Sequence, residues 1–530
     1  MERSQVKRRR QRSVGQEEQQ RAPLLEALVR HGARRPLALH VPGHRGERHF
    51  DAEGRPFFAP LLPLDVTELS GLDDLYQPQG AIAEAQALAA AAFGAEETFF
   101  LVNGSTAGNI AMVLAVCRPG DTLLVARDAH RSVFHACMLA GVRAVMLPTV
   151  VHPEFAVSCG VTPDAVREGL ERYPEARAVL LTNPNYYGMG RTLTAIAETV
   201  HARGLPLLVD EAHGAHFPFH PALPPTALAA GADAVVQSAH KTLPALTMGA
   251  FLHLQGRRVD RWKVRQALAM IQTSSPSYPV MASLDAARRW MVGEGRRRLG
   301  LLIEAARDFR QWLRQEGWTV PAEADGMYEW TDPLRLVLHH RKLSGFAVAR
   351  HLEAAAVFPE MADPLQVVCV VTAANREEDL TQLRRLLAGM GRDGRRPDRT
   401  PRLKERLQER LSAGWRAVYA ENGYAAVAFD PGWLHGAAEM VPWPAALGRR
   451  AAGMVVPYPP GIPLLLPGEP IRACHLALLE IYQQLDAHVQ GMWEGRLAVL
   501  AERTAEERPA PAQAAEDTGG EERRQRVYYV

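Results

Sequence analysis

The chain has 530 residues, of which 47% are hydrophobic and 23% are charged, and its formal net charge is +2. This length predicts two or three domains of a soluble globular protein, and the near-neutral charge gives no overall attraction to nucleic acid. No apolar run approaches the roughly 20 residues of a membrane helix, and the polar start lacks the apolar segment of a signal peptide. The cysteines show no C-x-x-C spacing, which predicts reduced thiols in a cytoplasmic protein.

Both ends of the chain, residues 1–22 and 501–530, are polar and charged, and we expect them to be disordered. Between them, short apolar runs alternate with helix-like stretches. The predicted strands are residues 98–102, 122–126, 144–147, 178–182, 206–209, 234–237 and 250–254. The predicted helices are residues 82–93, 106–116, 132–140, 163–172 and 194–203. This alternation predicts an α/β fold with a mostly parallel sheet and helices on both faces.

The pattern changes after about residue 275. A long helix is predicted over residues 284–313, followed by two strands (335–338 and 366–372) that flank a helix near 346–355. A charged linker follows at 393–402, and the proline-rich run at 457–463 excludes helix there. We therefore expect three domains, listed by residue number: a major domain at 23–300, a small α+β domain at 301–395 and a C-terminal domain at 396–500.

Two predicted strands end in the residues that a pyridoxal phosphate site requires. The strand at 206–209 runs into Asp210, and the strand at 234–237 runs into Ser238-Ala239-His240-Lys241. In an open parallel sheet, ligands bind at the carboxyl ends of the strands. The Lys241 amine would form a Schiff base with the cofactor aldehyde, and the Asp210 carboxylate would keep the pyridine nitrogen protonated, so that the ring accepts electrons. For these two residues alone, an ordinary ion pair is the alternative.

Two further strand ends carry candidate cofactor ligands. After the strand at 98–102, Asn103-Gly104-Ser105-Thr106 offers hydroxyls and free N–H groups at the start of a helix, which suits a phosphate, or else an ordinary helix cap. The nucleophile elbow G-x-S-x-G does not fit, because the centre of Gly104 to Gly108 is Thr106. After the strand at 122–126, His130 is placed to lay its ring on a cofactor ring, or else to cap a helix.

A metal site is the competing interpretation of the run after the strand at 206–209. Its ligands would be Asp210, His213, His216 and His220, whose spacing permits coordination. The nearby Lys241 and the phosphate-binding turn favour the organic cofactor, so we predict no metal. The small Ala212 would then let the cofactor ring lie flat against the backbone.

Together these motifs resemble the Orn/Lys/Arg decarboxylase family. The matching runs are Val41-Pro42-Gly43-His44, Asn103-Gly104-Ser105-Thr106, Asp128-Ala129-His130-Arg131-Ser132, Asp210-Glu211-Ala212-His213, Ser238-Ala239-His240-Lys241-Thr242-Leu243-Pro244-Ala245-Leu246-Thr247 and Tyr458-Pro459-Pro460-Gly461-Ile462-Pro463. They occur in order between about Leu37 and about Ile481. The family comprises bacterial pyridoxal-phosphate enzymes with the aspartate-aminotransferase fold (fold type I). The chain is similar to its short form, which lacks an N-terminal receiver-like domain.

The resemblance implies roles for individual residues. Lys241 would carry the cofactor, Asp210 would meet the pyridine nitrogen and His130 would stack on the ring. The other implied cofactor-binding residues are Ser105, Thr106, Ala212, His213, Ser238, His240 and, within Thr273-Ser274-Ser275-Pro276, Ser274. The last run would reach the phosphate of a partner subunit, which implies a homodimer or a multiple of dimers. Glu469 and Tyr458 are the candidates for binding the distal cation of the substrate, and a surface loop is the alternative for Glu469.

The implied reaction is the decarboxylation of arginine, lysine or ornithine to the amine and CO₂, in polyamine biosynthesis. Met248 and the run Asn183-Pro184-Asn185-Tyr186-Tyr187 depart from the usual family residues, so the resemblance does not select among the three substrates. Another fold-type-I enzyme, an aminotransferase or lyase, would usually show an arginine for the substrate carboxylate. An inactive cofactor-binding regulator is disfavoured by the intact Lys241 and Asp210.

Overall fold

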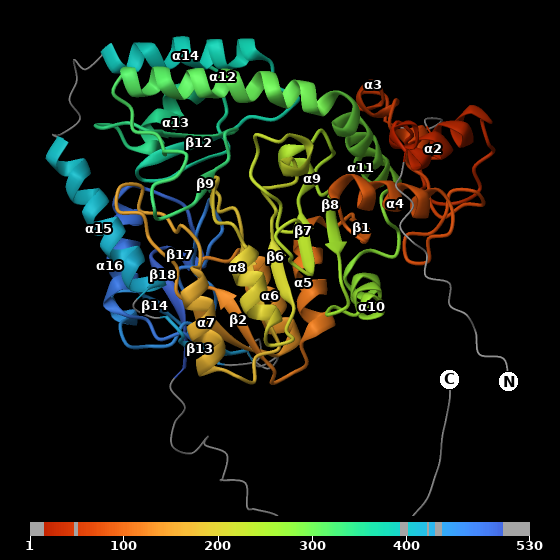
Figure 1. Ribbon diagram of the computed structural model, residues 1–530. Helices are drawn as coiled ribbons and strands as arrows, with labels where there is room; N and C mark the ends of the chain where they lie inside the picture. Colours follow the sequence, from red (N-terminus) through yellow and green to blue (C-terminus); the bar gives the residue numbers. More distant parts are fainter. Residues whose placement is uncertain (1–14, 47–50, 393–400, 421–422, 430–436, 502–530) are drawn as a thin grey trace, which may run out of the picture.

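The structure is a computed structural model that describes residues 15–46, 51–392, 401–420, 423–429 and 437–501 (Figure 1). Residues 1–14 and 502–530, expected to be disordered, lie outside the described residues, as does the predicted linker over 393–400. Residues 15–22 were also expected to be disordered, but they include helix α1 (Gln16–Gln19). The reason is a tertiary contact: the buried Arg288 donates to the Gln19 carbonyl, and Gln19 Nε2 donates to the Leu88 carbonyl at 3.1 Å.

An eight-stranded sheet forms the centre of the molecule, in the order β1-β8-β7-β6-β4-β2-β3-β13. Its strands are β1 (Glu97–Leu101), β2 (Thr122–Ala126), β3 (Arg143–Leu147), β4 (Ala178–Thr182), β6 (Leu207–Asp210), β7 (Ala234–Gln237), β8 (Ala250–Leu254) and β13 (Ala426–Ala428). Strands β3, β2, β4, β6 and β7 are parallel, whereas β8 is antiparallel to both of its neighbours and β13 is antiparallel to β3. The predicted mostly parallel sheet is confirmed.

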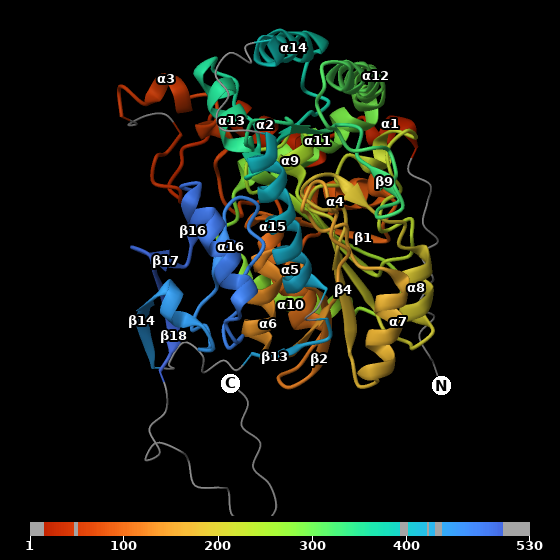
Figure 2. The same cartoon turned by 90° about the vertical axis from the view of Figure 1, so that its left-hand side faces the viewer.

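Helices cover both faces of this sheet (Figure 2). Leu123 and Val125 of β2 belong to the apolar cluster with α5 (Gly104–Val116), α6 (Arg131–Ala140) and α10 (Arg261–Ile271). Leu124 and Ala126 belong to the cluster with α7 (Pro163–Arg172) and α8 (Thr194–His201). Because alternate residues of the strand are buried on opposite faces, the strand is a continuous apolar run in the sequence.

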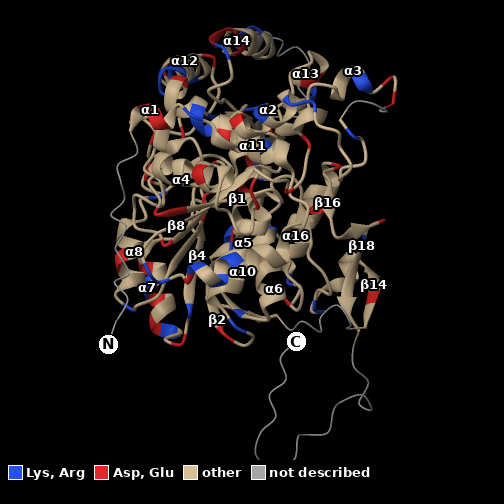
Figure 3. Cartoon of the chain, turned by 90° about the vertical axis from the view of Figure 1, so that its right-hand side faces the viewer, with Lys and Arg blue, Asp and Glu red and all other residues tan. Residues whose placement is uncertain are grey.

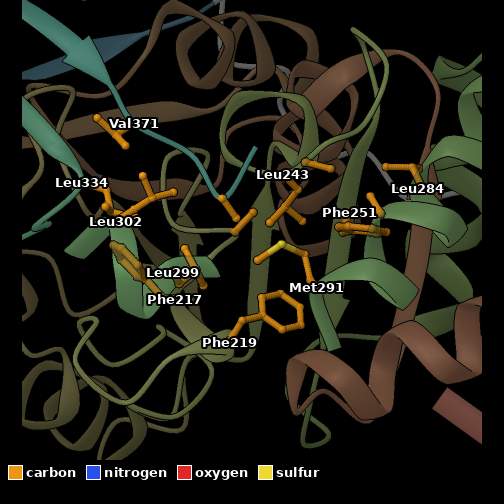
Figure 4. Close-up of a cluster of buried hydrophobic side chains, with 14 of the residues drawn as sticks. Phe217, Phe219, Leu243, Phe251, Leu284, Met291, Leu299, Leu302, Leu334 and Val371 are labelled. Atoms are coloured by element: carbon orange, nitrogen blue, oxygen red, sulfur yellow. The ribbon is translucent and has the colours of Figure 1, made fainter. Parts of the chain in front are cut away.

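A long helical segment joins the major domain to the small one. Helix α11 (Tyr278–Trp290) continues through a π-helical turn (Met291–Gly295) into α12 (Arg296–Gln315), so the predicted domain boundary at residue 300 lies within α12. Figure 4 shows Met291 and Leu299 of this segment beside Phe217, Phe219 and Phe251, with Leu334 and Val371 of the small domain in the same cluster. One continuous apolar core therefore fixes the small domain against the sheet.

The small domain is built on the antiparallel sheet β10-β12-β11. Its elements are β10 (Arg335–His339), α13 (Gly345–Ala354), β11 (Met361–Ala362), β12 (Gln366–Val370) and α14 (Glu377–Arg392). Figure 1 shows α14 lying along α12. The predicted α+β character is confirmed, and Arg335, the first residue of β10, lies beside His213, which follows β6 of the central sheet.

The C-terminal region packs around two helices, α15 (Pro401–Tyr419) and α16 (Ala473–Gln484) (Figure 2). Its strands are β14 (Ala438–Pro442), β15 (Val456–Pro457), β16 (Val489–Gln490), β17 (Met492–Trp493) and β18 (Arg496–Leu500). The remaining α-helices and strands are α2 (Pro23–Ala33), α3 (Arg55–Phe58), α4 (Ala81–Phe93), α9 (Ala239–Thr242), β5 (Met189–Gly190) and β9 (Trp330–Thr331). Because β13 completes the central sheet, this region is attached directly to the major domain.

The described helices include none that is long and apolar enough to cross a membrane. Acidic and basic residues are interspersed along the ribbon in Figure 3.

Candidate active site

The carboxyl ends of three parallel strands, β2, β6 and β7, bring the three predicted catalytic residues together. Strand β6 ends at Asp210, β7 leads into α9 with Lys241, and β2 leads to His130 at the N-cap of α6. The charges of Lys241 and Asp210 act on each other, and Lys241 also acts on His130. We call these three residues the Lys241 group. The sheet topology alone explains their proximity, because the ends of parallel strands lie at one edge.

A chain of hydrogen bonds links Asp210 to His130. Asn109 Nδ2 donates to Asp210 Oδ2 at 2.8 Å and to Ser132 Oγ at 2.9 Å, and Ser132 Oγ lies 2.7 Å from His130 Nδ1. The Ala212 N–H donates to the other carboxylate oxygen of Asp210 at 3.2 Å. The Ser132 N–H also donates to His130 Nδ1, at 3.3 Å, so Nδ1 is an acceptor. The Ser132 hydroxyl therefore donates to Nδ1 as well, and the imidazole proton lies on Nε2. Asp210 is thereby oriented by two donors.

The sequence analysis missed the roles of Asn109 and Ser132. Asn109 is fully buried within α5, whose other buried residues are mostly apolar. A buried amide in a helix core requires hydrogen-bond partners, because an unpaired polar group there is costly. A single amide on a buried, otherwise apolar helical face could therefore have predicted that Asn109 has a hydrogen-bonding role.

Burial sets the ionisation of the Lys241 group. It lowers the pKa of His130 to about 3, helped by the positive charges of Lys241 and Arg131. It also lowers the pKa of Lys241, against the opposing effect of Asp210, and it raises the pKa of Asp210 against the effects of Lys241 and Asn109. His130 is therefore a neutral ring at physiological pH, suited to stacking on another ring, and the Lys241 amine is more easily deprotonated than that of an exposed lysine.

His213 lies directly beside Lys241, with its Nε2 3.1 Å from Lys241 Nζ. On the other side of the ring, Arg335 Nη2 of β10 lies 3.1 Å from His213 Nδ1. The Tyr186 ring packs 4.7 Å, centroid to centroid, from His213, and Lys241 Nζ lies 5.6 Å from the Tyr186 ring centroid. The sequence analysis assigned no site role to Arg335 or Tyr186. An arginine that opens an otherwise apolar strand was the available signal for Arg335.

The predicted phosphate ligands fit a bound anion. Ser238 is fully buried, and its hydroxyl oxygen has no hydrogen-bond partner among the described residues; the same holds for the buried hydroxyl of Thr242. An unsatisfied buried hydroxyl costs about 1–3 kcal/mol, which a phosphate oxygen would offset. Ser105 is half-buried at the N-terminus of α5 and Thr106 is exposed there, while His240 Nδ1 lies 3.1 Å from the Gly249 carbonyl oxygen. These residues therefore fit the predicted pyridoxal phosphate.

The predicted Ser274 and two histidines of the competing metal interpretation are not gathered around Lys241 within the chain. Ser274 is exposed, and the described contacts of its run are local or go to Tyr76, which donates to the Thr273 carbonyl. Of the histidines in the competing metal interpretation, His216 Nε2 lies 3.2 Å from Asp332 and His220 accepts from the Ala222 N–H. The described part of the chain contains no group of three or more residues arranged to hold a metal ion.

The Glu469 carboxylate is engaged by Arg127, which follows β2. Arg127 Nη2 lies 3.2 Å from Glu469 Oε2, and the Leu466 N–H donates to the same oxygen at 3.0 Å. Arg127 is almost fully buried and also donates to the carbonyls of Pro463 and Leu464, at 2.8 and 3.0 Å. Among the described residues, no hydrogen bond or ion pair joins Glu469 to the Lys241 group. The assignment of Glu469 to the substrate cation stays a prediction.

The proline-rich run nevertheless reaches the Lys241 group through Gly461. Its carbonyl accepts from the Arg131 N–H at 3.1 Å, and a Cβ added at Gly461 would lie 3.2 Å from the His130 ring. Gly461 has φ +91°, a conformation that favours glycine. Tyr458 is 42% exposed, and the Arg131 guanidinium lies 5.5 Å from its ring centroid. Tyr458 is therefore near the rim of the site.

Comparison with known proteins identifies the family. The model of the Orn/Lys/Arg decarboxylase major domain matches residues 22–332, and the model of the C-terminal domain of these enzymes matches residues 423–495. The chain is 42% identical to the protein YaaO of Bacillus subtilis over 479 residues, which cover 88% of this chain and 96% of that protein. It is 33% identical to an arginine decarboxylase of Halalkalibacterium halodurans over 483 residues, which cover 89% of this chain and 96% of the relative.

Solved structures share the fold. The lysine decarboxylase of Francisella novicida matches with a TM-score of 0.76 at 20% identity and covers 90% of this chain and 80% of that chain. The lysine decarboxylase A of Pseudomonas aeruginosa also has a TM-score of 0.76, at 22% identity, over 91% and 81% of the two chains. The predicted fold, cofactor and enzyme class are confirmed. The chain belongs to the Orn/Lys/Arg decarboxylase family, and it is a pyridoxal-phosphate-dependent carboxy-lyase that decarboxylates a basic amino acid.

Proposed function

We propose that this enzyme decarboxylates arginine, ahead of lysine and ornithine, at the Lys241 group. The observation that carries the proposal is the convergence of Lys241, Asp210 and His130 at the carboxyl edge of the sheet. Support for arginine comes from the relatives named arginine decarboxylases, at 33% identity, whereas the constitutive lysine decarboxylase of Escherichia coli is 26% identical.

Each residue of the site has a distinct task in this proposal. When bound, the cofactor supplies the ring that accepts the electron pair of the bond between Cα and the carboxylate. Lys241 would hold the cofactor, Asp210 would keep a proton on the pyridine nitrogen, and His130 would stack against the ring. Ser105, Thr106, Ser238 and His240 would bind its phosphate, with Ala212 and His213 alongside. The purified protein should be yellow, and borohydride should fix the cofactor on Lys241, whereas label on another lysine would contradict the assignment.

A carboxylate near the Lys241 group supports a cationic substrate. Glu360 is exposed and immediately precedes β11, and its negative charge partly offsets the burial that lowers the pKa values of Lys241, His240 and Arg335. Its neighbour Met361 packs in the same apolar cluster as Tyr187, with Tyr186 against it. A distal guanidinium or ammonium group would find its counter-charge there.

The Glu360 carboxylate can be tested by neutralising it. A partly exposed ion pair is worth up to about 1 kcal/mol, so Glu360→Gln should raise the KM for arginine about fivefold with little change in kcat. Glu353→Gln, at an exposed glutamate of α13, is the matched control and should change neither. An unchanged KM in Glu360→Gln would remove this carboxylate from substrate binding.

Product analysis tests the substrate directly. Incubation with arginine, lysine and ornithine separately should give agmatine as the main product, with cadaverine and putrescine at lower rates. Cadaverine as the main product would show that lysine is the preferred substrate, and putrescine would show that ornithine is. Release of CO₂ only from a neutral or acidic amino acid would overturn the assignment to a basic substrate.

We further propose a composite site in a homodimer or a multiple of dimers, in which Ser274 reaches the cofactor phosphate of the partner subunit. Its exposure in the single chain leaves it available for such a contact. Subunits carrying Lys241→Ala should regain activity when mixed with subunits carrying Ser274→Ala and Ser275→Ala, because one hybrid site is intact. Inactive heterodimers of demonstrated composition would contradict the composite site.

We also propose a cytoplasmic enzyme of polyamine biosynthesis. The free cysteines Cys117, Cys137 and Cys159 are buried, which suits a reducing compartment, and agmatine is a precursor amine for polyamines. Fractionation of the cells and measurement of their polyamines after deletion test both statements. An unchanged polyamine content would contradict a role of the enzyme in polyamine biosynthesis.

Arg335 favours amino transfer as a second activity of the same site. It is buried beside His213, and its Nε and Nη1 have no hydrogen-bond partner among the described residues, so it could bind a substrate carboxylate. The assay is the formation of a 2-oxo acid from arginine in the presence of pyruvate. A rate below one per thousand decarboxylations would leave Arg335 without this role.

A further inference from the structure

We propose that Arg335 is a positioning residue that fixes the tautomer of His213, so that His213 Nε2–H faces the Lys241 nitrogen and holds it as an unprotonated amine. The inference rests on the proposed role of Lys241 as the amine that carries the cofactor. The three side chains come from separate elements: Arg335 begins β10, His213 follows β6, and Lys241 lies in α9.

The direction of the two hydrogen bonds follows from donor chemistry. Arg335 Nη2 lies 3.1 Å from His213 Nδ1, and a guanidinium N–H can only donate, so Nδ1 must accept. A neutral imidazole that accepts at Nδ1 carries its proton on Nε2. His213 Nε2 then donates across the 3.1 Å to Lys241 Nζ, and a nitrogen can accept there only as a neutral amine. An ammonium group at Lys241 would place its own N–H groups against the Nε2–H of His213.

The backbone of Arg335 is held in place independently of His213, and its side chain is enclosed. Arg310 Nη2 donates to the carbonyls of Asp332 and Arg335, each at 2.8 Å, and Arg335 itself is 1% exposed. A Cβ added at Gly188 would lie 2.6 Å from the Cβ of Arg335, so the glycine, with φ +78°, makes room for the arginine. Water does not substitute readily for so buried a donor.

The other charges around Lys241 do not determine the direction of the hydrogen bond between His213 Nε2 and Lys241 Nζ. The titratable or charged side chains that act on Lys241, or that it acts on, are Asp210, His130, His213, His240, Arg335 and Glu360, and the Tyr186 ring lies beside it. Asp210 and Glu360 favour the ammonium form, whereas burial and Arg335 favour the amine. The contact from His213 adds a directional bond that only the amine can accept. The tautomer of His213 therefore stabilises the neutral, nucleophilic amine of Lys241, whereas the carboxylates of Asp210 and Glu360 favour the ammonium form.

The test measures the amine itself, in cofactor-free protein and without any amino acid substrate. Competitive labelling with acetic anhydride across pH, read by mass spectrometry of the Lys241 peptide, gives the midpoint at which Lys241 becomes reactive. The exposed Lys263 serves as the internal reference. The wild-type midpoint should lie below that of Lys263. Arg335→Met should raise it by about one pH unit, a tenfold loss of free amine at neutral pH, as expected for one hydrogen bond.

A double-mutant cycle separates the tautomer from the charge of Arg335. His213→Phe should also raise the midpoint by about one pH unit, and adding Arg335→Met to it should raise it little further, because both act through one contact. Full additivity would show that Arg335 acts only by its charge and would overturn the proposal. If Arg335→Met does not fold, an unchanged midpoint in His213→Phe alone would also overturn it.

Arg191→Met is the matched control, since it removes a buried arginine that donates to the Cys159 and Met327 carbonyls without touching His213. Its midpoint should equal that of the wild type, and a shift as large as that of Arg335→Met would reveal general loosening and overturn the proposal. Thermal unfolding confirms that each variant is folded. Because no substrate is present, failure to decarboxylate arginine would leave these midpoints unaffected, so the two proposals fail separately.

Discussion

The carboxyl edge of the central sheet and the proline-rich part of the C-terminal region both supplied predicted site residues, with different results. At the sheet edge, Asp210, His130 and Lys241 converge. In the C-terminal region, the Glu469 carboxylate turns to Arg127. The difference is physical: strand order fixes where every strand end lies, whereas the direction of a loop side chain depends on the partner it meets. A motif at a strand end therefore predicts where its residues lie, whereas a motif on a loop leaves the direction of each side chain to the packing.

The largest effect that tests this comparison is expected from Asp210→Asn. The amide keeps an oxygen to accept from Asn109, so the fold should survive, but the charge that would hold a proton on the pyridine nitrogen is lost. Such a charge-assisted bond is worth roughly 1.5–3 kcal/mol, and each ~1.4 kcal/mol is tenfold in rate, so kcat should fall about 100-fold. Steady-state kinetics measure the fall in kcat, and the cofactor absorbance shows whether the variant still binds the cofactor. Near wild-type turnover would remove Asp210 from the chemistry.

A smaller loss is expected from Asn109→Ala, which removes a donor to Asp210 while leaving the carboxylate. Loss of one hydrogen bond to a charged group predicts about a tenfold fall in kcat, with the carboxylate still present. Asn185→Ala, at a buried asparagine that donates to the Ser158 carbonyl, is the control for loss of a buried amide. An equal loss of activity in both variants would assign Asn109 to the fold instead of the site.

Glu469→Gln distinguishes the two roles available to the loop carboxylate. Because Arg127 is almost fully buried, removing its charged partner should destabilise the protein by about 1–3 kcal/mol, a few degrees in the thermal midpoint, with an unchanged KM for arginine. The matched control is Glu439→Gln, whose partner Arg449 pairs with it at the surface. A raised KM at an unchanged thermal midpoint would instead support the substrate role predicted from the sequence.

Elements whose order depends on residues close in the sequence could be predicted, whereas elements ordered by distant residues could not. Strands β2, β4, β7 and β8 have the predicted bounds, since burial on both faces makes each a bounded apolar run. Helix α1 was missed, because its order comes from Arg288, far along the chain.

The site shows the same division. Lys241 and Asp210 could be predicted as site residues, because each follows an apolar run that is recognisable as a strand. Arg335 and Tyr186 do not, because they reach Lys241 only after the small domain and the loop after β4 fold onto the sheet. Arg127 could not be paired with Glu469 from the sequence, since the two meet only through the packing of the C-terminal region.

The smallest expected effect on activity concerns Glu211, the neighbour of Asp210, which contacts a different set of residues. Its carboxyl group accepts from Gln237 Nε2 at 2.6 Å and from the Ala227 N–H at 2.8 Å, and burial raises its pKa from 4.5 to about 8. The folded state therefore retains a proton that the unfolded state has released. The stability contributed by Glu211 is complete below about pH 4.5 and is lost as the pH rises through about 8.

Glu211→Gln removes this titration while keeping the size of the side chain. The variant should gain thermal stability relative to the wild type as the pH rises from 5 to 8, by at most about 1.4 kcal/mol for each pH unit. Its kcat should stay within about twofold of the wild type, since Glu211 meets Gln237 and Ala227 and not the Lys241 group, in contrast to Asp210→Asn. A difference in thermal midpoint that stays constant across this pH range would show that Glu211 is ionised in the folded protein. A large loss of activity would show that the two neighbouring carboxylates share one task, and that a strand end does not separate a functional side chain from a structural one.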